Sequence, residues 1–208
     1  MSPVFVDKPS PTTHALPMVR RIDDQRGLWG MALFISTEAS LFLVLFFSYY
    51  WLDKTSSTWR AQIPPQLNRS LPMLAILVVS NAILLWGHRQ VKRELYARGR
   101  WALVASIILG FGFLGLAYFD YIQEFIHLTP TVNSYGSMFY TIVTIHESHV
   151  LFGLLMMLWV LILPSWEPRL YSPHRPYANI TMFWTFSTIL WFVIVVLFYI
   201  APVVYNAL

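Results

Sequence analysis

Four ionisable side chains lie inside long apolar stretches of this sequence. Glu38 stands in the first stretch, and His146, Glu147 and His149 stand close together in a later one. An ionisable side chain at the centre of a bilayer is costly unless it is paired, neutral or hydrated. His146 and His149 are three residues apart and share a helix face, whereas Glu147 points roughly 100° away from them. We therefore interpret the four residues as a buried polar cluster.

The depths of these residues support a contact between two helices. Glu38 lies ten residues into its stretch, which is ~15 Å along a helix. His146, Glu147 and His149 lie nine to twelve residues into theirs, which enters from the opposite membrane face. Both sets therefore fall near mid-membrane. We hypothesise that Glu38 hydrogen-bonds one of the two histidines in the interior of the protein.

Three interpretations of this contact require different chemistry. It can be a tie that neutralises buried polar groups and joins two helices, or a relay that passes protons. In the third interpretation, nitrogen and oxygen atoms of the cluster bind iron, copper or zinc. The tie is favoured over the relay. The metal site is the least favoured, because the i, i+3 spacing of the histidines is common by chance and Glu147 faces away. We assign no catalytic residue and no metal ligand.

A second pair with ligand-like spacing is Glu124 and His127, a Glu-x-x-His motif of the kind used in di-iron helix bundles. Such bundles need two facing motifs, and this sequence has one, near the end of an apolar stretch. We interpret it as a hydrated pair at the membrane interface. The sequence also has no phosphate-binding loop, dinucleotide fingerprint or nucleophile–base motif. We expect no cofactor in this chain.

The elements that position these residues are predicted from hydropathy. Of the 208 residues, 57% are hydrophobic and 12% are charged, too apolar for a soluble domain of this size. Crossing the hydrocarbon takes roughly 20 helical residues. The predicted fold class is all-α, a polytopic membrane bundle of five transmembrane helices within one domain, 28–208. The predicted spans are 28–51, 69–88, 101–119, 137–163 and 179–201.

Two further features concern the ends of these spans. Residues 1–27 are predicted to form a polar arm on the membrane face, in which four prolines, Pro17 among them, discourage helix. The second span is the shortest apolar run, and its Pro72 suits a first helical turn.

The basic residues predict the orientation of the chain. The N-terminal arm and the second and fourth loops share one side of a five-span protein, and together they hold 11 of the 14 Lys and Arg residues. The positive-inside rule then places the N-terminus in the cytoplasm and the C-terminus outside. The same clustering beside the spans argues against a nucleic-acid partner, although the isoelectric point is about 9.4.

Two stretches in the first half of the chain resemble motifs of the haem–copper oxidase subunit III family, in its five-helix bacterial form. Gly30 to Phe42 is similar to Gly-x-x-x-Phe-x-x-Ser-Glu-x-x-x-Phe, with Glu38 on the family's intramembrane carboxylate. Leu109 to Tyr121 is similar to Leu-Gly-x-x-Phe-Leu-x-x-Gln-x-x-Glu-Tyr. In the second stretch Ala117 replaces the usual Gln and Asp120 the usual Glu.

Two later stretches carry the resemblance to the C-terminus. Gly136 to Gly153 is similar to Gly-Ser-x-Phe-Phe followed by His-Gly-x-His-Val and Gly, with Glu147 in place of the second Gly. Phe183 to Trp191 is similar to Tyr-Trp-His-Phe-Val-Asp-x-x-Trp, with Thr185 for His and Thr188 for Asp. The four stretches occur in the family's order, and the departures indicate a divergent branch.

The resemblance implies an accessory subunit without redox centres in a proton-pumping terminal oxidase of aerobic respiration. Haem and copper would belong to subunit I, the catalytic partner, with subunit II alongside and electrons arriving from cytochrome c. The chain would be enzymatic only as part of that oxidoreductase, which reduces oxygen to water in the bacterial inner membrane. It would stabilise subunit I, sustain its proton uptake and hold phospholipids in a V-shaped cleft.

Small, polar and aromatic residues within the spans are predicted to face other helices or the lipid cleft. Glycine allows close backbone approach, and polar side chains in lipid seek a partner helix. The residues assigned to this group are Ser80, Asn81, Gly110, Gly115, Asp120, Trp184 and Trp191.

Several alternatives remain open at the level of sequence. The same family resemblance fits a third subunit of a quinol oxidase or of a nitric oxide reductase-associated complex, because the electron donor is set by other chains. Membership of a larger respiratory supercomplex is equally compatible. An independent proton or ion transporter would use Glu38 and the two histidines near mid-membrane. A metal-dependent membrane enzyme would use the same groups as ligands.

Overall fold

The computed structural model describes residues 17–55, 67–127, 134–162 and 174–201, all of them helical except the short turn between α2 and α3. Five helices are long and apolar enough to cross a membrane, which confirms the predicted fold class. The elements are α1 (Pro17–Thr55), α2 (Leu67–Lys92), α3 (Tyr96–His127), α4 (Ser134–Ile162) and α5 (His174–Val195), and α5 continues into the π-helical turn η3 (Val196–Ile200). The side chains described are those of 27–55, 68–123, 134–162 and 174–201.

Each helix begins before the apolar stretch that predicted it. The helix α1 begins at Pro17, so the expectation that this proline discourages helix was wrong. A proline at the first helical position loses no hydrogen bond, because the N–H it lacks would have had no intrahelical partner. Pro72 is the sixth residue of α2 rather than part of its first turn. Its missing N–H therefore leaves the carbonyl of Asn68 without that intrahelical bond.

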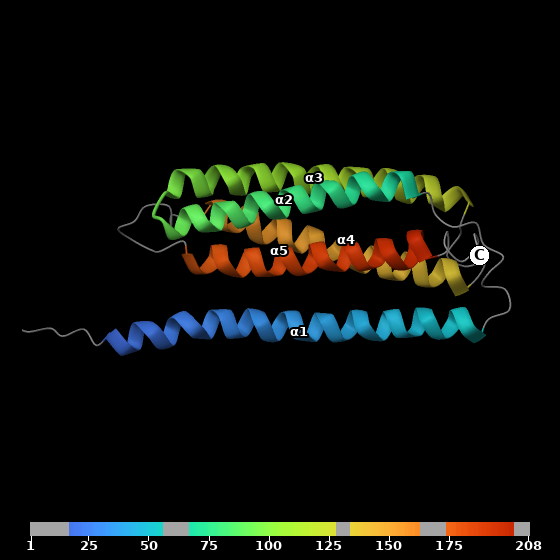
Figure 1. Cartoon of the computed structure of the whole chain (residues 1–208), viewed down its shortest axis with the longest axis horizontal. Helices are drawn as coiled ribbons and strands as arrows, with labels where there is room; N and C mark the ends of the chain where they lie inside the picture. Colours follow the sequence, from blue (N-terminus) through green and yellow to red (C-terminus); the bar gives the residue numbers. More distant parts are fainter. Residues whose placement is uncertain (1–16, 56–66, 128–133, 163–173, 202–208) are drawn as a thin grey trace, which may run out of the picture.

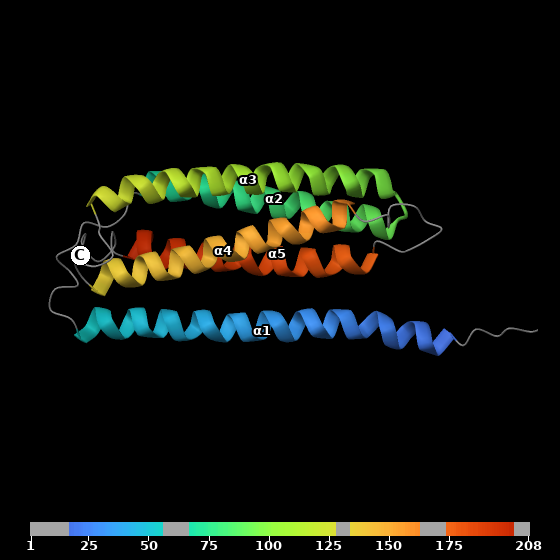
Figure 2. The ribbon, with the colours of Figure 1, turned by 180° about the vertical axis from the view of Figure 1, so that it is seen from behind.

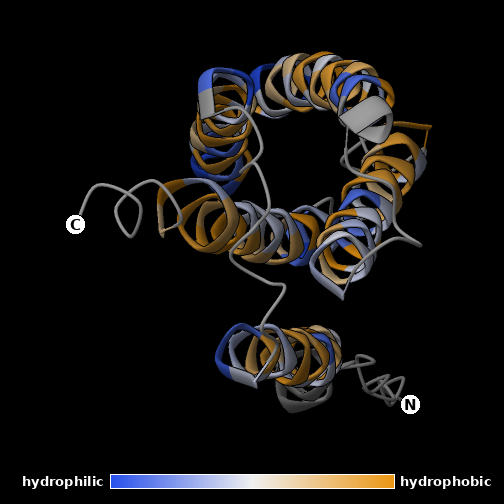
Figure 3. Ribbon diagram, turned by 90° about the vertical axis from the view of Figure 1, so that its right-hand side faces the viewer, coloured by the Kyte–Doolittle hydropathy of each residue, from blue (hydrophilic) through white to orange (hydrophobic). Residues whose placement is uncertain are grey.

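The five helices run side by side in three layers (Figures 1 and 2). The helices α2 and α3 form one outer layer, α4 and α5 lie in the middle, and α1 forms the opposite side. Viewed end-on, α1 stands apart from the ring made by the other four (Figure 3). Glu38 of α1 can therefore meet the polar residues of α4 only across the interface between α1 and the middle layer.

The turn between α2 and α3 is stabilised by backbone hydrogen bonds. Leu95 donates its N–H to Gln90 O, and Glu94 donates its N–H to Val91 O, both at 3.0 Å. Glu94 has a φ of 63°, the left-handed conformation usual for the residue that closes this type of helix end. The turn sets α3 antiparallel to α2 along its length.

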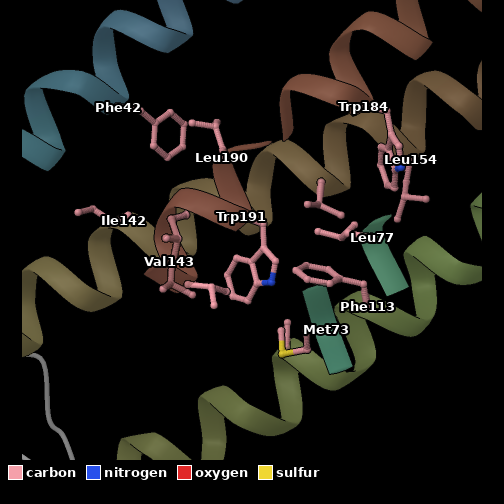
Figure 4. Packing of buried hydrophobic residues seen from close by; sticks show 14 of the residues in the cluster. Phe42, Met73, Leu77, Phe113, Ile142, Val143, Leu154, Trp184, Leu190 and Trp191 are labelled. Carbon is pink, nitrogen blue, oxygen red and sulfur yellow. The ribbon is translucent and has the colours of Figure 1, made fainter. Parts of the chain in front are cut away.

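The core of the protein surrounds α5. Trp184 and Trp191 are almost completely buried, and Figure 4 shows them among Leu77, Phe113 and Leu154 of the neighbouring helices. Moving a tryptophan from lipid into the space between helices brings little hydrophobic gain, because lipid is already apolar. Van der Waals packing therefore holds these rings in place. The core is therefore made chiefly by α2, α3, α4 and α5 around two indoles, and Phe42 and Tyr49 of α1 and Phe198 and Tyr199 of η3 also belong to it.

Candidate functional site

Glu38 of α1 and His149 of α4 meet near the middle of the apolar spans of their helices. Glu38 Oε2 lies 3.0 Å from His149 Nε2, and the two side chains are 23% and 12% exposed. The ring of Phe42 stands edge-on to His149 at 5.3 Å, and the ring of Phe183 stacks on it at 6.2 Å. Aromatic rings from α1 and α5 thus cover the polar pair.

The hydrogen bonds of His149 determine how many protons the pair carries. His149 Nδ1 lies 2.7 Å from Ile145 O, and a carbonyl oxygen can only accept, so Nδ1 carries a proton. Nε2 then either donates to a Glu38 carboxylate as part of an imidazolium, or accepts from a protonated Glu38. In both cases one proton lies between the two residues and the pair is electrically neutral. Neutrality accounts for an acid and a base inside the hydrocarbon.

His146 faces a different neighbour. It is fully buried, and its Nε2 donates to Ser187 O of α5 at 3.0 Å. Its ring stacks on Trp191 at 5.0 Å and meets the edge of Phe113 at 6.0 Å. The bond to a carbonyl places a proton on Nε2, and Nδ1 is buried with no hydrogen-bond partner among the described residues. A second proton on Nδ1 would be a buried charge without a partner, so His146 is a neutral packing residue of the α3–α4–α5 core.

Glu147 lines a small cavity on a third side of α4. The cavity is bordered by Asp120 of α3, Met73 of α2, Trp191 of α5 and Tyr199 of η3, and also by Ala117, Tyr121, Phe139 and Val143. The sequence indicated that Glu147 points away from the histidines, and here it faces α3 instead of α1. The predicted polar cluster is thus divided: its three residues on α4 contact three different neighbours.

Polar residues of the predicted packing group join three helices on the other side of α5. Ser80 of α2 and Ser106 of α3 exchange hydrogen bonds with each other's carbonyl oxygens at 3.3 and 3.1 Å. Trp184 Nε1 donates to Ser80 Oγ at 3.2 Å. Thr185 Oγ1 donates to Asn81 Oδ1 at 2.9 Å, where the family pattern has a histidine. These contacts occur where helices cross, as polar groups in lipid require.

The two glycines of the predicted group have different surroundings. A Cβ on Gly110 would lie 2.6 Å from Leu154 Cδ2 and 3.0 Å from Trp184, so its small size permits this contact. A Cβ on Gly115 would meet nothing within 4 Å, and Gly115 is exposed. Gly115 therefore packs against no other described helix of this chain, in contrast to the predicted packing role, because its face of α3 points outward.

Asp120 pairs with Arg69 across α3 and α2. Arg69 Nη1 lies 3.4 Å from Asp120 Oδ1, and Asp120 is 8% exposed. Glu124 and His127 belong to the last helical turn of α3, but their side chains lie outside the described residues. No group of three or more histidine or acidic side chains able to hold a metal ion occurs in the described parts of the chain.

Several residues with polar contacts across helices were not singled out in the sequence. The Ser106 hydroxyl donates to Ser80 O, the Ser187 carbonyl accepts from His146, the Tyr177 hydroxyl donates to Gly99 O, and Arg69 pairs with Asp120. Ser106 carries a weak signal, since a hydroxyl in an apolar run often bonds only its own helix, and a backbone carbonyl such as that of Ser187 carries none. Arg69 could have been recognised as the basic residue at the start of the second span.

Comparisons with known proteins give consistent matches along the chain. Residues 19–202 match the family model described as cytochrome c oxidase subunit III. The chain is 28% identical over 177 residues to cytochrome c oxidase subunit 3 of Synechocystis sp., covering 83% of this chain and 75% of the relative. It is 29% identical over 179 residues to the protein of the same name in Bacillus sp. strain PS3, with 84% and 86% covered. For Gallus gallus the identity is 29% over 179 residues, with 80% and 67% covered.

Proposed function

This chain belongs to the cytochrome c oxidase subunit III family, and we propose on that premise that it is the accessory, non-redox subunit of a proton-pumping terminal oxidase. Its role is to stabilise the haem- and copper-bearing subunit I, to sustain proton uptake there and to hold phospholipids, beside a subunit II that receives electrons from cytochrome c. The host membrane is a bacterial inner membrane, with the N-terminus in the cytoplasm and the C-terminus outside.

The observation that carries this proposal is the neutral pair between Glu38 and His149. The mid-membrane acid of α1 is bonded within the chain, and the second nitrogen of its partner is bonded to Ile145 O. Because both nitrogens of His149 are bonded within the chain, the pair supports a structural tie between α1 and α4. Such a tie fits a subunit of a complex in which another subunit carries out the redox reaction. The exposed apolar residues of α1, such as Leu43 and Phe47, supply surface for lipid or a partner subunit.

Substitution of Glu38 separates the tie from a proton relay. In Glu38→Gln, the side-chain amide can still donate to His149 Nε2, but it cannot transfer a proton. In Glu38→Leu, the bond is lost altogether. A tie predicts that Glu38→Gln keeps assembly and oxygen consumption near the wild-type level while Glu38→Leu weakens assembly. A relay predicts that both variants lose proton pumping although Glu38→Gln still assembles.

The assembly itself is tested by purification from gently solubilised membranes through a tag on this chain. The proposal predicts that haem absorbance and oxygen-consuming activity with reduced cytochrome c co-purify. Activity with quinol in place of cytochrome c would assign the chain to a quinol oxidase. A haem-free solitary chain would contradict the proposal and favour an independent transporter.

A further inference from the structure

Two acidic side chains from different helices face one cavity inside the bundle. Asp120 of α3 and Glu147 of α4 both line it, and Tyr121 and Tyr199 contribute phenol rings. The cavity has a volume of about 10 Å³. A water molecule needs about 10–15 Å³ of such space and two to four polar partners. Size and lining therefore match one water molecule.

The indole of Trp191 points to an occupant of this cavity. Trp191 is 1% exposed, it lines the cavity, and its Nε1 has no hydrogen-bond partner among the described residues. In Figure 4 the indole nitrogen lies on the side of the ring that faces Phe113 and Met73, and Met73 is a lining residue. An indole N–H can only donate, so it requires an acceptor. Trp184 shows the usual arrangement, with its Nε1 bonded to Ser80 Oγ.

The charges around the cavity distinguish the two acids. Burial disfavours charge on the Asp120 carboxyl, and the guanidinium of Arg69 on α2, 3.4 Å away, opposes that effect. No ion pair with Glu147 is found in the described part of the chain. His146 stacks on the ring of Trp191 and bonds to Ser187 O. Two neighbouring carboxylates within the hydrocarbon would repel each other, so one of them must keep its proton. Glu147 is that residue.

Three of the five residues at which this sequence departs from the family pattern lie together in the structure, whereas Thr185 and Thr188 lie elsewhere on α5. Ala117 stands where the pattern has a larger Gln, Asp120 where it has a longer Glu, and Glu147 where it has a Gly. All three line the cavity. Two shortened side chains make space on α3, and an added carboxyl on α4 reaches into it. These three departures thus lie around one cavity.

We propose that Asp120, Glu147 and Trp191 form a binding site for one water molecule, which holds a proton on Glu147 beside an ionised Asp120. The Trp191 N–H and the Glu147 O–H donate to the water oxygen, and the water donates to the Asp120 carboxylate. The site holds its proton on a different side of α4 from the Glu38–His149 pair. A metal ion is not the occupant, because only two carboxyls line the cavity and Arg69 engages one of them.

Infrared difference spectra of the purified full-length chain at neutral pH test the protonation. Subtracting the spectrum of Glu147→Gln from that of the wild type should leave the C=O stretching band of a protonated carboxyl, which shifts in deuterated water. Asp120→Asn should instead remove carboxylate bands. Trp191→Phe keeps both acids and should move the Glu147 band by removing one donor to the water. The matched control, Trp159→Phe, changes an exposed tryptophan of α4 and should leave the band in place.

Carboxylate bands in the Glu147→Gln difference would overturn the proposal, as would a band that Trp191→Phe leaves unmoved. A second measurement does not depend on the folding of variants. A high-resolution cryo-electron microscopy map of the wild-type chain in its complex should show one water within hydrogen-bonding distance of Trp191 Nε1 and both carboxyls. A map that resolves other buried waters but none here would contradict the proposal, as would a direct bond from Trp191 to Glu147.

Discussion

The helices α1 and α5 are both predicted from hydropathy to span the membrane, yet they are held in different ways. Within the apolar stretch of α5 and η3, 56% of the residues are buried, whereas 6% are buried in that of α1. The helix α5 packs against α2, α4 and α1, with the indole rings of Trp184 and Trp191 buried among its neighbours. The helix α1 packs mainly on α4 and α5 and also contacts η3 through Tyr49. Helix packing in lipid depends on van der Waals contact and hydrogen bonds. We infer that packing holds α5 and that specific contacts hold α1.

The contacts of α1 occur at separate levels along the helix. The ring of Phe34 stacks on Phe183 at 6.0 Å, and the Glu38–His149 pair lies at mid-membrane. Further along, Tyr49 contacts Phe198 at 4.4 Å between ring centroids and donates its O–H to Leu197 O at 3.4 Å. The outward surface of α1 is left for lipid or another subunit. The loss of one contact should therefore affect α1 locally, whereas a gap beside α5 should affect the whole bundle.

The largest effect is expected from Trp184→Ala. The change opens a cavity between α2, α4 and α5 and leaves Ser80 Oγ without its indole donor. We expect a loss of roughly 3 kcal/mol in the free energy of unfolding, mostly from the cavity. Unfolding of the purified chain by added SDS in mixed micelles measures it. Trp159→Ala is the control, because Trp159 is 63% exposed, and an equal loss there would contradict the packing argument.

The glycines give the next largest effect. A Cβ on Gly153 would lie 2.9 Å from Trp184 Cε3, so Gly153→Ala should destabilise the chain by about 1–2 kcal/mol through overpacking. Gly115→Ala meets open space and should be neutral or stabilising, because alanine favours helix. The same SDS titration compares the two variants. If Gly115→Ala leaves the chain stable but weakens assembly, its face of α3 contacts a partner subunit.

A smaller effect is expected where a hydroxyl joins helices. Ser80→Ala removes bonds to both Ser106 and Trp184 and should cost about 1 kcal/mol. Ser40→Ala on α1 is the matched control, since the Ser40 hydroxyl donates to Ser36 O of its own helix. The difference between the two unfolding free energies isolates the interhelical part. If Ser80→Ala and Ser40→Ala lowered the free energy of unfolding equally, the interhelical bonds around α5 would add no stability beyond that of a bond within α1. That result would contradict the difference inferred between the two helices.

Much of this fold could be predicted from the sequence, because hydropathy reports directly which residues lie in hydrocarbon. The five spans and the similar depth of Glu38 and His149 follow from it. The ends of the helices do not, since hydropathy marks the hydrocarbon boundary and α1 continues as helix back to Pro17. Helical spacing also put His146 and His149 on one face, and only the crossing of α1, α4 and α5 determines which of them meets Glu38.

The outward position of Gly115 and the cavity beside Glu147 share a single cause. Both depend on how far each helix is rotated about its axis, and the hydrophobic pattern of a membrane helix constrains that rotation weakly. In a soluble protein the polar face would set it, but both faces of these helices are apolar. Rotation is set instead by contacts such as those of Trp184 and Trp191, which depend on all the helices together.

A double-mutant cycle on Glu38 and His149 tests the central claim most directly, because it measures the tie itself. The free energies of SDS-induced unfolding would be compared for the wild type, Glu38→Leu, His149→Phe and the double variant. Each single change leaves a buried partner unpaired, so the double variant should be more stable than the sum of the single losses predicts, by about 0.6 kcal/mol. Losses that simply add would show that Glu38 and His149 act independently, and would contradict a tie between α1 and α4.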